Sequence, residues 1–136
     1  MLKRITLPLL SAIVIVVALT AAGHDDEATL YDPVEGVSTF TKTFAARGPR
    51  DRQGRSLRDF DLKRRLFKYQ LSYMIYSEAF DAMPDTAKDR VYRRLFEVLS
   101  GEDKSEKFAK LSLDDRANIL AILRDTKPNL PPYWSR

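Results

Sequence analysis

The sequence predicts an all-α protein, a small helical bundle of three principal helices with minor helices, preceded by a signal peptide. Three observations predict this class. Apolar residues recur every three or four positions between residues 57 and 123, helix start and stop signals bracket these stretches, and no run is long enough to argue for a sheet. With 136 residues, the chain has the length of a single domain.

The N-terminal segment predicts export. A short basic start with Lys3 and Arg4 is followed by an apolar run over residues 7–17 and then by small residues, the pattern of a cleaved signal peptide over residues 1–23. The alternative is an uncleaved anchor through residues 5–22, which just reaches the length needed to span a bilayer. Both interpretations place the remainder outside the cytoplasm: periplasmic or secreted, or held at the inner membrane by the anchor.

Two scarce residue types restrict the chemistry. The chain has no cysteine, so it has no disulfide, no thiol nucleophile, no cysteine-ligated metal and no covalently attached c-type haem. His24 is the only histidine, which excludes most general-base and zinc constellations. The sequence therefore assigns no catalytic residue, no metal ligand and no cofactor, and it argues against an enzyme.

Residues 24–46 are predicted to form a flexible arm. The arm begins with an acidic patch over residues 24–27 and continues through turn-forming proline and glycine. Residues 37–46 are compatible with either a short helix or an extended segment. In both cases we expect Phe40 and Phe44, which are four positions apart, to dock on the body of the protein.

A helical domain is predicted over residues 47–136. It opens with a loop at residues 48–55, where two glycines and a proline accompany charged and polar residues. Ser56 has an acidic residue, Asp59, three positions on, which is a helix-start signal. The apolar residues that follow share helical spacing: Leu57, Phe60, Phe67 and Leu71. We therefore predict the first principal helix from Leu57 to Phe80.

Two further helices follow from their end signals. Pro84 is suited to the first position of a helix that ends near Gly101. Ser112 is predicted to cap the last helix, which stops at Lys127 before a proline. Between these helices, a single helical turn is expected at Phe108.

The C-terminal tail contains two adjacent prolines and is predicted to be extended rather than helical. It ends in two large aromatic residues, Tyr133 and Trp134. These side chains either lie against the helices or remain available to a partner.

Four short segments carry a resemblance: GRSLRDFDLKRRLFKY at residues 54–69, SYMIYSEAFD at 72–81, YRRL at 92–95 and LPPYW at 130–134. They are similar to an uncharacterised family of exported bacterial proteins, and the resemblance covers residues 47–134. It implies the company of haem-containing envelope proteins but assigns no catalytic residue. The family pattern has Pro-Cys where this chain has Gln70 and Leu71, so a role of that cysteine is absent here.

Basic residues crowd the middle of the chain. Residues 47–68 hold nine basic residues against three acidic ones. Arginine offers forked donors, so this stretch is suited to an anionic lipid headgroup, an acidic protein or a phosphate-bearing ligand; nucleic acid is not expected for an exported protein. The alternative is a solvated face with internal pairs such as Asp61 with Arg65. The candidate binding residues are Arg50, Arg52, Arg55, Arg58, Arg64 and Arg65.

Aromatic residues form the second candidate surface. On the predicted first helix, Tyr69, Tyr73 and Tyr76 fall in one row, which suits a protein partner or a planar ligand. The alternative is the ordinary rim of helix packing. Tyr133 and Trp134 complete the candidate binding residues.

These patterns predict an exported, non-enzymatic helical module that binds a protein partner in the cell envelope or an anionic membrane surface. The alternative is a periplasmic accessory protein of a respiratory or haem-containing system that binds a planar ligand without covalent attachment.

Overall fold

The described part of the chain is all-α, as the sequence predicts. The computed structural model describes residues 39–135, so the predicted signal peptide of residues 1–23 and the acidic patch of residues 24–27 lie outside it. Residues 39–135 contain four α-helices, three short 3-10 helices (η) and one isolated β-bridge. In chain order the helices are α2 (Phe40–Ala46), η1 (Tyr73–Tyr76), α3 (Glu78–Asp81), α4 (Asp85–Leu99), η2 (Glu106–Phe108), α5 (Leu113–Thr126) and η3 (Pro132–Ser135).

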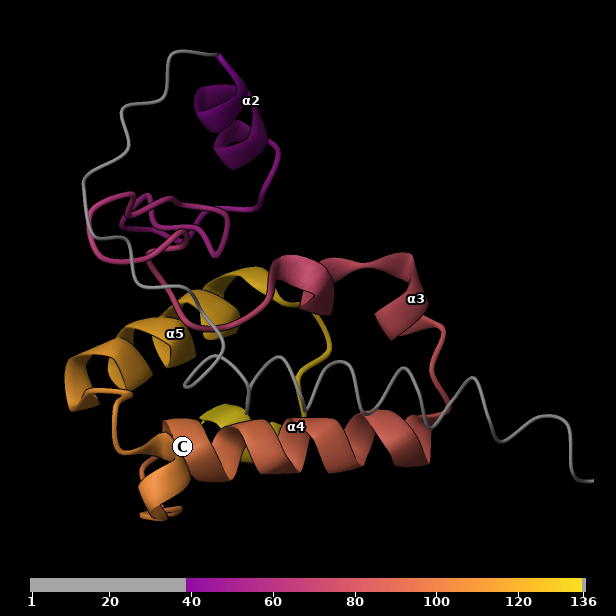
Figure 1. Cartoon of the computed structure of the whole chain (residues 1–136). Helices are drawn as coiled ribbons and strands as arrows, with labels where there is room; N and C mark the ends of the chain where they lie inside the picture. Colours follow the sequence, from indigo (N-terminus) through magenta and orange to yellow (C-terminus); the bar gives the residue numbers. More distant parts are fainter. Residues whose placement is uncertain (1–38, 136) are drawn as a thin grey trace, which may run out of the picture.

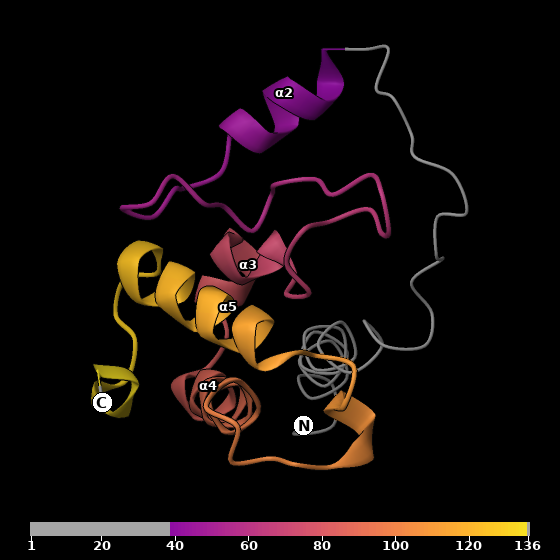
Figure 2. The same ribbon diagram turned by 90° about the vertical axis from the view of Figure 1, so that its left-hand side faces the viewer.

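The two longest helices, α4 and α5, lie side by side and run in opposite directions (Figure 1, Figure 2). They confirm two of the three predicted principal helices. The α4 helix follows Pro84 and is closed by Gly101, which adopts a left-handed φ of 83° that favours glycine. At the start of α5, the Ser112 hydroxyl oxygen accepts a hydrogen bond from the Asp115 backbone N–H at 3.0 Å, as expected of an N-cap.

One continuous apolar core joins α4 and α5 to the segments around them. Its α5 members are fully buried, and Trp134 of the tail is only 1% exposed. Burial of these side chains is the main driving force for the fold. The core residues are Leu57, Tyr69, Leu71, Ile75, Phe80, Met83, Ala87, Val91, Tyr92, Leu95, Val98, Leu99, Phe108, Leu111, Ile119, Ile122, Leu123 and Trp134.

The prediction of a first principal helix over Leu57–Phe80 is wrong. Residues 47–72 follow an irregular, turn-rich path between α2 and the rest of the protein (Figure 1). After α2, helical structure resumes only at η1 and α3. The helix-start signal at Ser56 produces a single turn. In that turn the Ser56 N–H donates to Asp59 Oδ2 at 2.9 Å, and the Asp59 N–H donates to the Ser56 carbonyl oxygen at 3.1 Å.

The physical reason lies in a second periodicity within the same stretch. Phe67, Tyr69 and Leu71 point inwards and alternate with exposed Leu66 and Lys68, which is the period of an extended chain rather than a helix.

This extended chain folds back as a hairpin. The rings of Phe60 and Phe67 stack across the bridge with centroids 5.2 Å apart. The two-residue tip is closed by the Leu62 N–H, which donates to the Arg65 carbonyl oxygen at 2.9 Å.

The α2 helix forms an outer layer on this hairpin, which matches the short-helix alternative for residues 37–46. It has no buried residue of its own. Phe44 attaches it, because its ring lies 5.4 Å from the ring of Phe60, 6.1 Å from that of Phe67 and 5.2 Å from that of Tyr73. Figure 2 shows α2 above the hairpin, with α3, α5 and α4 following below.

The prediction of a non-helical tail is also wrong in detail, since Pro132–Ser135 form the 3-10 turn η3. A single turn needs few backbone N–H donors; Pro131 precedes it and Pro132 is its first residue, so their missing donors cost nothing. Of the two alternatives for Trp134, the structure shows the one in which it lies against the helices: its ring packs 6.1 Å from the ring of Tyr92 and 5.5 Å from that of Phe96.

Among the helices of residues 39–135, none has the length and apolar character of a membrane span.

Candidate functional site

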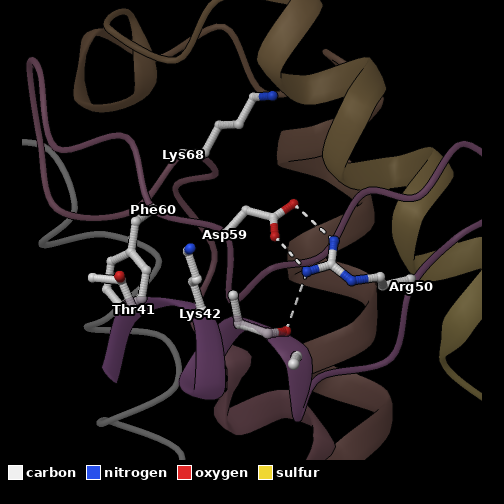
Figure 3. A pocket seen from close by; sticks show the side chains of 8 residues that line it. Thr41, Lys42, Arg50, Asp59, Phe60 and Lys68 are labelled. Carbon is white, nitrogen blue, oxygen red and sulfur yellow. Dashed lines mark hydrogen bonds and ion pairs between the residues drawn. The ribbon is translucent and has the colours of Figure 1, made fainter. Parts of the chain in front are cut away.

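An open basic hollow lies where α2 meets the hairpin (Figure 3). We call it the basic hollow; its volume is about 540 Å³, and its lining comes from α2 and from the loop and hairpin of residues 50–68. The residues that line it are Thr41, Lys42, Ala45, Ala46, Arg50, Asp59, Phe60 and Lys68. Three cations face one carboxylate in this set, so the lining carries a net charge of +2.

Arg50 fixes the walls of the basic hollow to one another. Its Nη2 donates to Asp59 Oδ1 at 3.0 Å and to the Ala45 carbonyl oxygen at 3.3 Å. Its Nη1 donates to the Gly54 carbonyl oxygen at 2.6 Å. One guanidinium therefore connects the end of α2, the loop and the hairpin, and it occupies the only carboxylate of the lining.

Lys42 and Lys68 are left with their charges uncompensated. Both side chains are exposed, and neither forms an ion pair with another residue of the described range 39–135. Figure 3 shows Lys42 rising from α2 beside Phe60 and Asp59. The Lys68 side chain extends away from Phe60, and its ammonium lies 5.6 Å from the centroid of the Tyr69 ring. An ammonium beside a half-buried ring, as at Lys42 and Phe60, favours an anionic group carried on an apolar stem, such as the side chain of glutamate.

Two predicted binding arginines connect the loop to α5. Arg52 pairs with Asp125, with Nη2 to Oδ1 at 2.7 Å, although its own side chain is 89% exposed. The hydrogen bond from the Arg52 side chain, and then that from its backbone N–H, hold the pKa of Asp125 below its ordinary value. Arg55 donates from Nη1 to Asn118 Oδ1 at 2.7 Å and from Nε to Asp51 Oδ2 at 2.7 Å.

Asp51 is the anchor of this loop and is 6% exposed. Its Oδ1 accepts hydrogen bonds from the backbone N–H groups of Gln53 and Arg55. Burial by itself raises the pKa of Asp51, but the backbone and side-chain hydrogen bonds from Arg55 together outweigh it, so the pKa lies below its ordinary value.

The remaining predicted arginines differ in their surroundings. The Arg58 guanidinium lies between two rings, with its central carbon 4.8 Å from the centroids of both Phe44 and Tyr73. Arg65 donates to the carbonyl oxygens of Phe67 at 3.1 Å and Lys68 at 2.8 Å.

Arg64, at the hairpin tip, is 85% exposed and lies 3.7 Å from Asp61. Of the six predicted arginines, Arg52 and Arg64 are therefore two that project strongly into solvent.

The predicted aromatic residues do not form one row. Tyr69 is a core residue, 3% exposed, whereas Tyr73 belongs to the ring cluster under α2. The Tyr76 hydroxyl lies 2.5 Å from Thr126 Oγ1, and burial raises its pKa. Tyr133 packs on Phe96 with ring centroids 5.4 Å apart. The row required the Leu57–Phe80 helix, which does not form.

A second hollow of about 610 Å³ lies between the start of α4 and the tail. Its carboxylates are mostly paired: Asp81 Oδ1 lies 2.6 Å from Lys127 Nζ, and Asp85 lies 3.4 Å from Lys88. Burial, reinforced by Asp81 and Tyr133, raises the pKa of Tyr92 to about 12, so its hydroxyl stays protonated at neutral pH. Over residues 39–135, no cluster of three or more acidic or imidazole side chains could hold a metal ion.

Sequence reasoning missed the two cations that the basic hollow leaves uncompensated. Lys68 was one of the nine basic residues of the stretch, but nothing distinguished it from the arginines. Lys42 lies outside that stretch. The one sequence signal for its position was the spacing of Phe40 and Phe44, because this spacing fixes which side of α2 meets the hairpin. The partners of the arginines, Asp125 and Asn118, are 73 and 63 positions away from them and gave no local signal.

The fold and the hollow together define a small all-α protein with an open, positively charged surface. Comparison with family models, curated proteins and solved structures finds no match to this chain. The resemblance to exported bacterial proteins therefore stays a prediction from the sequence.

Proposed function

We propose that this chain is an exported, non-enzymatic helical module that binds an acidic segment of a protein partner in the cell envelope through the basic hollow. The observation that carries this proposal is the contrast among the cations. Arg50, Arg52 and Arg55 have carboxylate partners within the fold, while Lys42 and Lys68, which line the hollow with exposed side chains, have none among residues 39–135.

The shape of the site supports a peptide rather than a small substrate. The hollow is open and shallow, and its surface is mixed polar and apolar. The ring of Phe40, which is 60% exposed, has its centroid 6.4 Å from that of the lining residue Phe60. An extended acidic segment can place carboxylates on Lys42 and Lys68 and an apolar side chain against these rings. Attraction of this kind is strong at low ionic strength and weakens with added salt.

The planar-ligand alternative receives no specific support within residues 39–135. The rings of Tyr69, Tyr73 and Tyr76 contact other parts of the protein, so they are engaged in the fold.

Binding of a fluorescent oligoglutamate peptide to the purified chain, followed by anisotropy, tests the proposal. We expect the Lys42→Glu, Lys68→Glu double variant to bind about tenfold more weakly, because each reversed charge is worth up to about 1 kcal/mol at an exposed site. The control is Arg90→Glu with Lys104→Glu, which changes the net charge equally at exposed positions away from the hollow. Equal weakening by both pairs would show that only total charge matters, and would overturn the proposal.

A membrane surface is the competing occupant. Vesicles of phosphatidylcholine with phosphatidylglycerol, compared with phosphatidylcholine alone, distinguish it. Lysine-dependent sedimentation with the anionic vesicles, without lysine-dependent peptide binding, would assign the hollow to lipid and contradict a protein partner.

A further inference from the structure

An anionic segment of the same chain directly precedes α2 in the sequence. Residues 24–38 contain five acidic residues and no lysine or arginine, so this segment has a charge of −5 with histidine neutral. The acidic residues are Asp25, Asp26, Glu27, Asp32 and Glu35. By contrast, residues 39–68 hold ten basic residues against three acidic ones, a charge of +7. The sign of charge therefore reverses at the start of α2.

The connection is short. The acidic segment continues directly into α2, whose Thr41, Lys42 and Ala45 line the hollow. Thr39 lies seven positions after Asp32, and an extended chain of that length spans up to about 25 Å. Pro33 and Gly36 lie between them and are residue types that reverse a chain. Covalent attachment at this length gives an effective local concentration on the order of millimolar.

We propose that residues 24–35 of this same chain occupy the basic hollow and compete there with the partner's acidic segment. The carboxylates of Asp32 and Glu35 are the nearest to the hollow in sequence and pair with Lys42 and Lys68; Asp25, Asp26 and Glu27 add longer-range attraction. The competition rests on the proposed function, whereas the contact within the chain does not depend on it.

The absence of native cysteine makes the contact directly measurable. In the full exported chain, the pair Tyr31→Cys and Ala46→Cys places one thiol in the acidic segment and one on the lining of the hollow. Both substitutions preserve every charge. The comparison is the same cysteine pair in a chain whose five acids are neutralised: Asp25→Asn, Asp26→Asn, Glu27→Gln, Asp32→Asn and Glu35→Gln. We expect the disulfide to form under mild oxidation at least about fivefold faster in the chain with its native acids than in this neutralised chain. High salt should slow its formation. The neutralised chain keeps the same tether length, so it controls for simple proximity.

A second pair controls for the destination of the segment. Tyr31→Cys with Ala82→Cys carries the second thiol to an exposed position at the end of α3, away from the lining of the basic hollow. We expect its oxidation rate to be unaffected by neutralising the acids. Equal rates for the neutralised and native forms of the Ala46 pair would overturn the inference.

The consequence for binding is measured with the oligoglutamate peptide. Neutralising the five acids is expected to tighten peptide binding about threefold or more, because the competing segment is removed. If the peptide binds through Lys42 and Lys68 but neutralisation changes neither its affinity nor the crosslinking, the internal competitor is overturned and the proposed function stands. If crosslinking depends on the acids but no acidic peptide binds even after neutralisation, the contact stands and the proposed function is overturned.

Discussion

The guanidinium of Arg116, in the first turns of α5, donates a hydrogen bond to the carbonyl oxygen of Val98 in the last turn of α4. The same side chain donates to the carbonyl oxygens of Leu111 at 3.0 Å, Phe108 at 2.8 Å and Asp103 at 3.2 Å. Arg116 is only 8% exposed. A single buried cation thus donates to four carbonyl groups around the end of α4 and the connection to α5. Two of them also accept from the backbone: Val98 from the Gly101 N–H at 3.3 Å and Phe108 from the Leu111 N–H at 3.1 Å.

Replacement of Arg116 by methionine is expected to lower the free energy of unfolding by about 3 kcal/mol or more. Methionine keeps the apolar stem, but it removes all four hydrogen bonds of the guanidinium, and hydrogen bonds to charged groups contribute about 1.5–3 kcal/mol each. Urea denaturation followed by circular dichroism measures the change. The matched control, Arg90→Met on the exposed side of α4, should stay within about 0.5 kcal/mol. A similar small effect at Arg116 would mean that water replaces the guanidinium.

Two tyrosine hydroxyls provide a second, internally controlled test. Tyr76 has a hydroxyl partner in Thr126, whereas the buried Tyr133 hydroxyl has no hydrogen-bond partner among residues 39–135. Tyr76→Phe is therefore expected to destabilise the protein by about 1 kcal/mol, and Tyr133→Phe to be neutral or stabilising. The melting temperature should therefore fall for Tyr76→Phe and stay the same or rise for Tyr133→Phe. Equal losses would show that Tyr133 has a partner, such as an ordered water.

The sequence predicted the two longest helices because their signals are local. Ser112 and Gly101 act through hydrogen bonds or φ angles within a few residues of their own position, so a pattern of three or four residues is enough to identify them. The face that α4 buries also follows from the spacing of its apolar residues. The α5 stripe expected to begin at Leu113 is wrong in part, because Leu113 is 79% exposed and the helix buries Ile119, Ile122 and Leu123.

The same reasoning could not resolve residues 57–80. There the apolar residues fit a helix and an extended chain equally well, and the choice depends on contacts from outside the segment. Phe44 packs on the hairpin from the preceding residues, and Arg55 reaches Asn118 on α5. Likewise, whether an arginine is available for a partner depends on carboxylates far away in sequence, such as Asp125 for Arg52.

Acid should weaken the anchoring of the 51–55 loop. The pKa of Asp51 is lower in the folded chain than its ordinary value of 3.8. The carboxylate therefore contributes its full stabilisation above pH 3.8, and this stabilisation is lost as the pH falls through the lower pKa of the folded chain. Protonation of the unfolded chain then favours unfolding. We expect Asp51→Asn to be less stable at neutral pH and to show a shallower loss of stability below about pH 4. Exposed Asp114→Asn is the control and should retain the acid-dependent loss of the native chain.

Phe44 should decide whether α2, and with it the basic hollow, stays in place. This helix buries no residue, and its Phe44 ring contacts the rings of Phe60, Phe67 and Tyr73 as well as the Arg58 guanidinium. Loss of these contacts favours local opening of α2 while the core of α4 and α5 remains folded.

Phe44→Ala is therefore expected to speed trypsin cleavage after Lys42 about tenfold or more, which corresponds to roughly 1.4 kcal/mol in the opening equilibrium. The melting temperature of the core should change little. The control is Phe40→Ala: that ring is 60% exposed, so its removal should accelerate cleavage less. Equal acceleration by both variants would contradict the anchoring role of Phe44. Because Lys42 lines the hollow, the Phe44 variant should also lose affinity for oligoglutamate although its net charge is unchanged. This result would show that binding depends on the position of the cations as well as on their number.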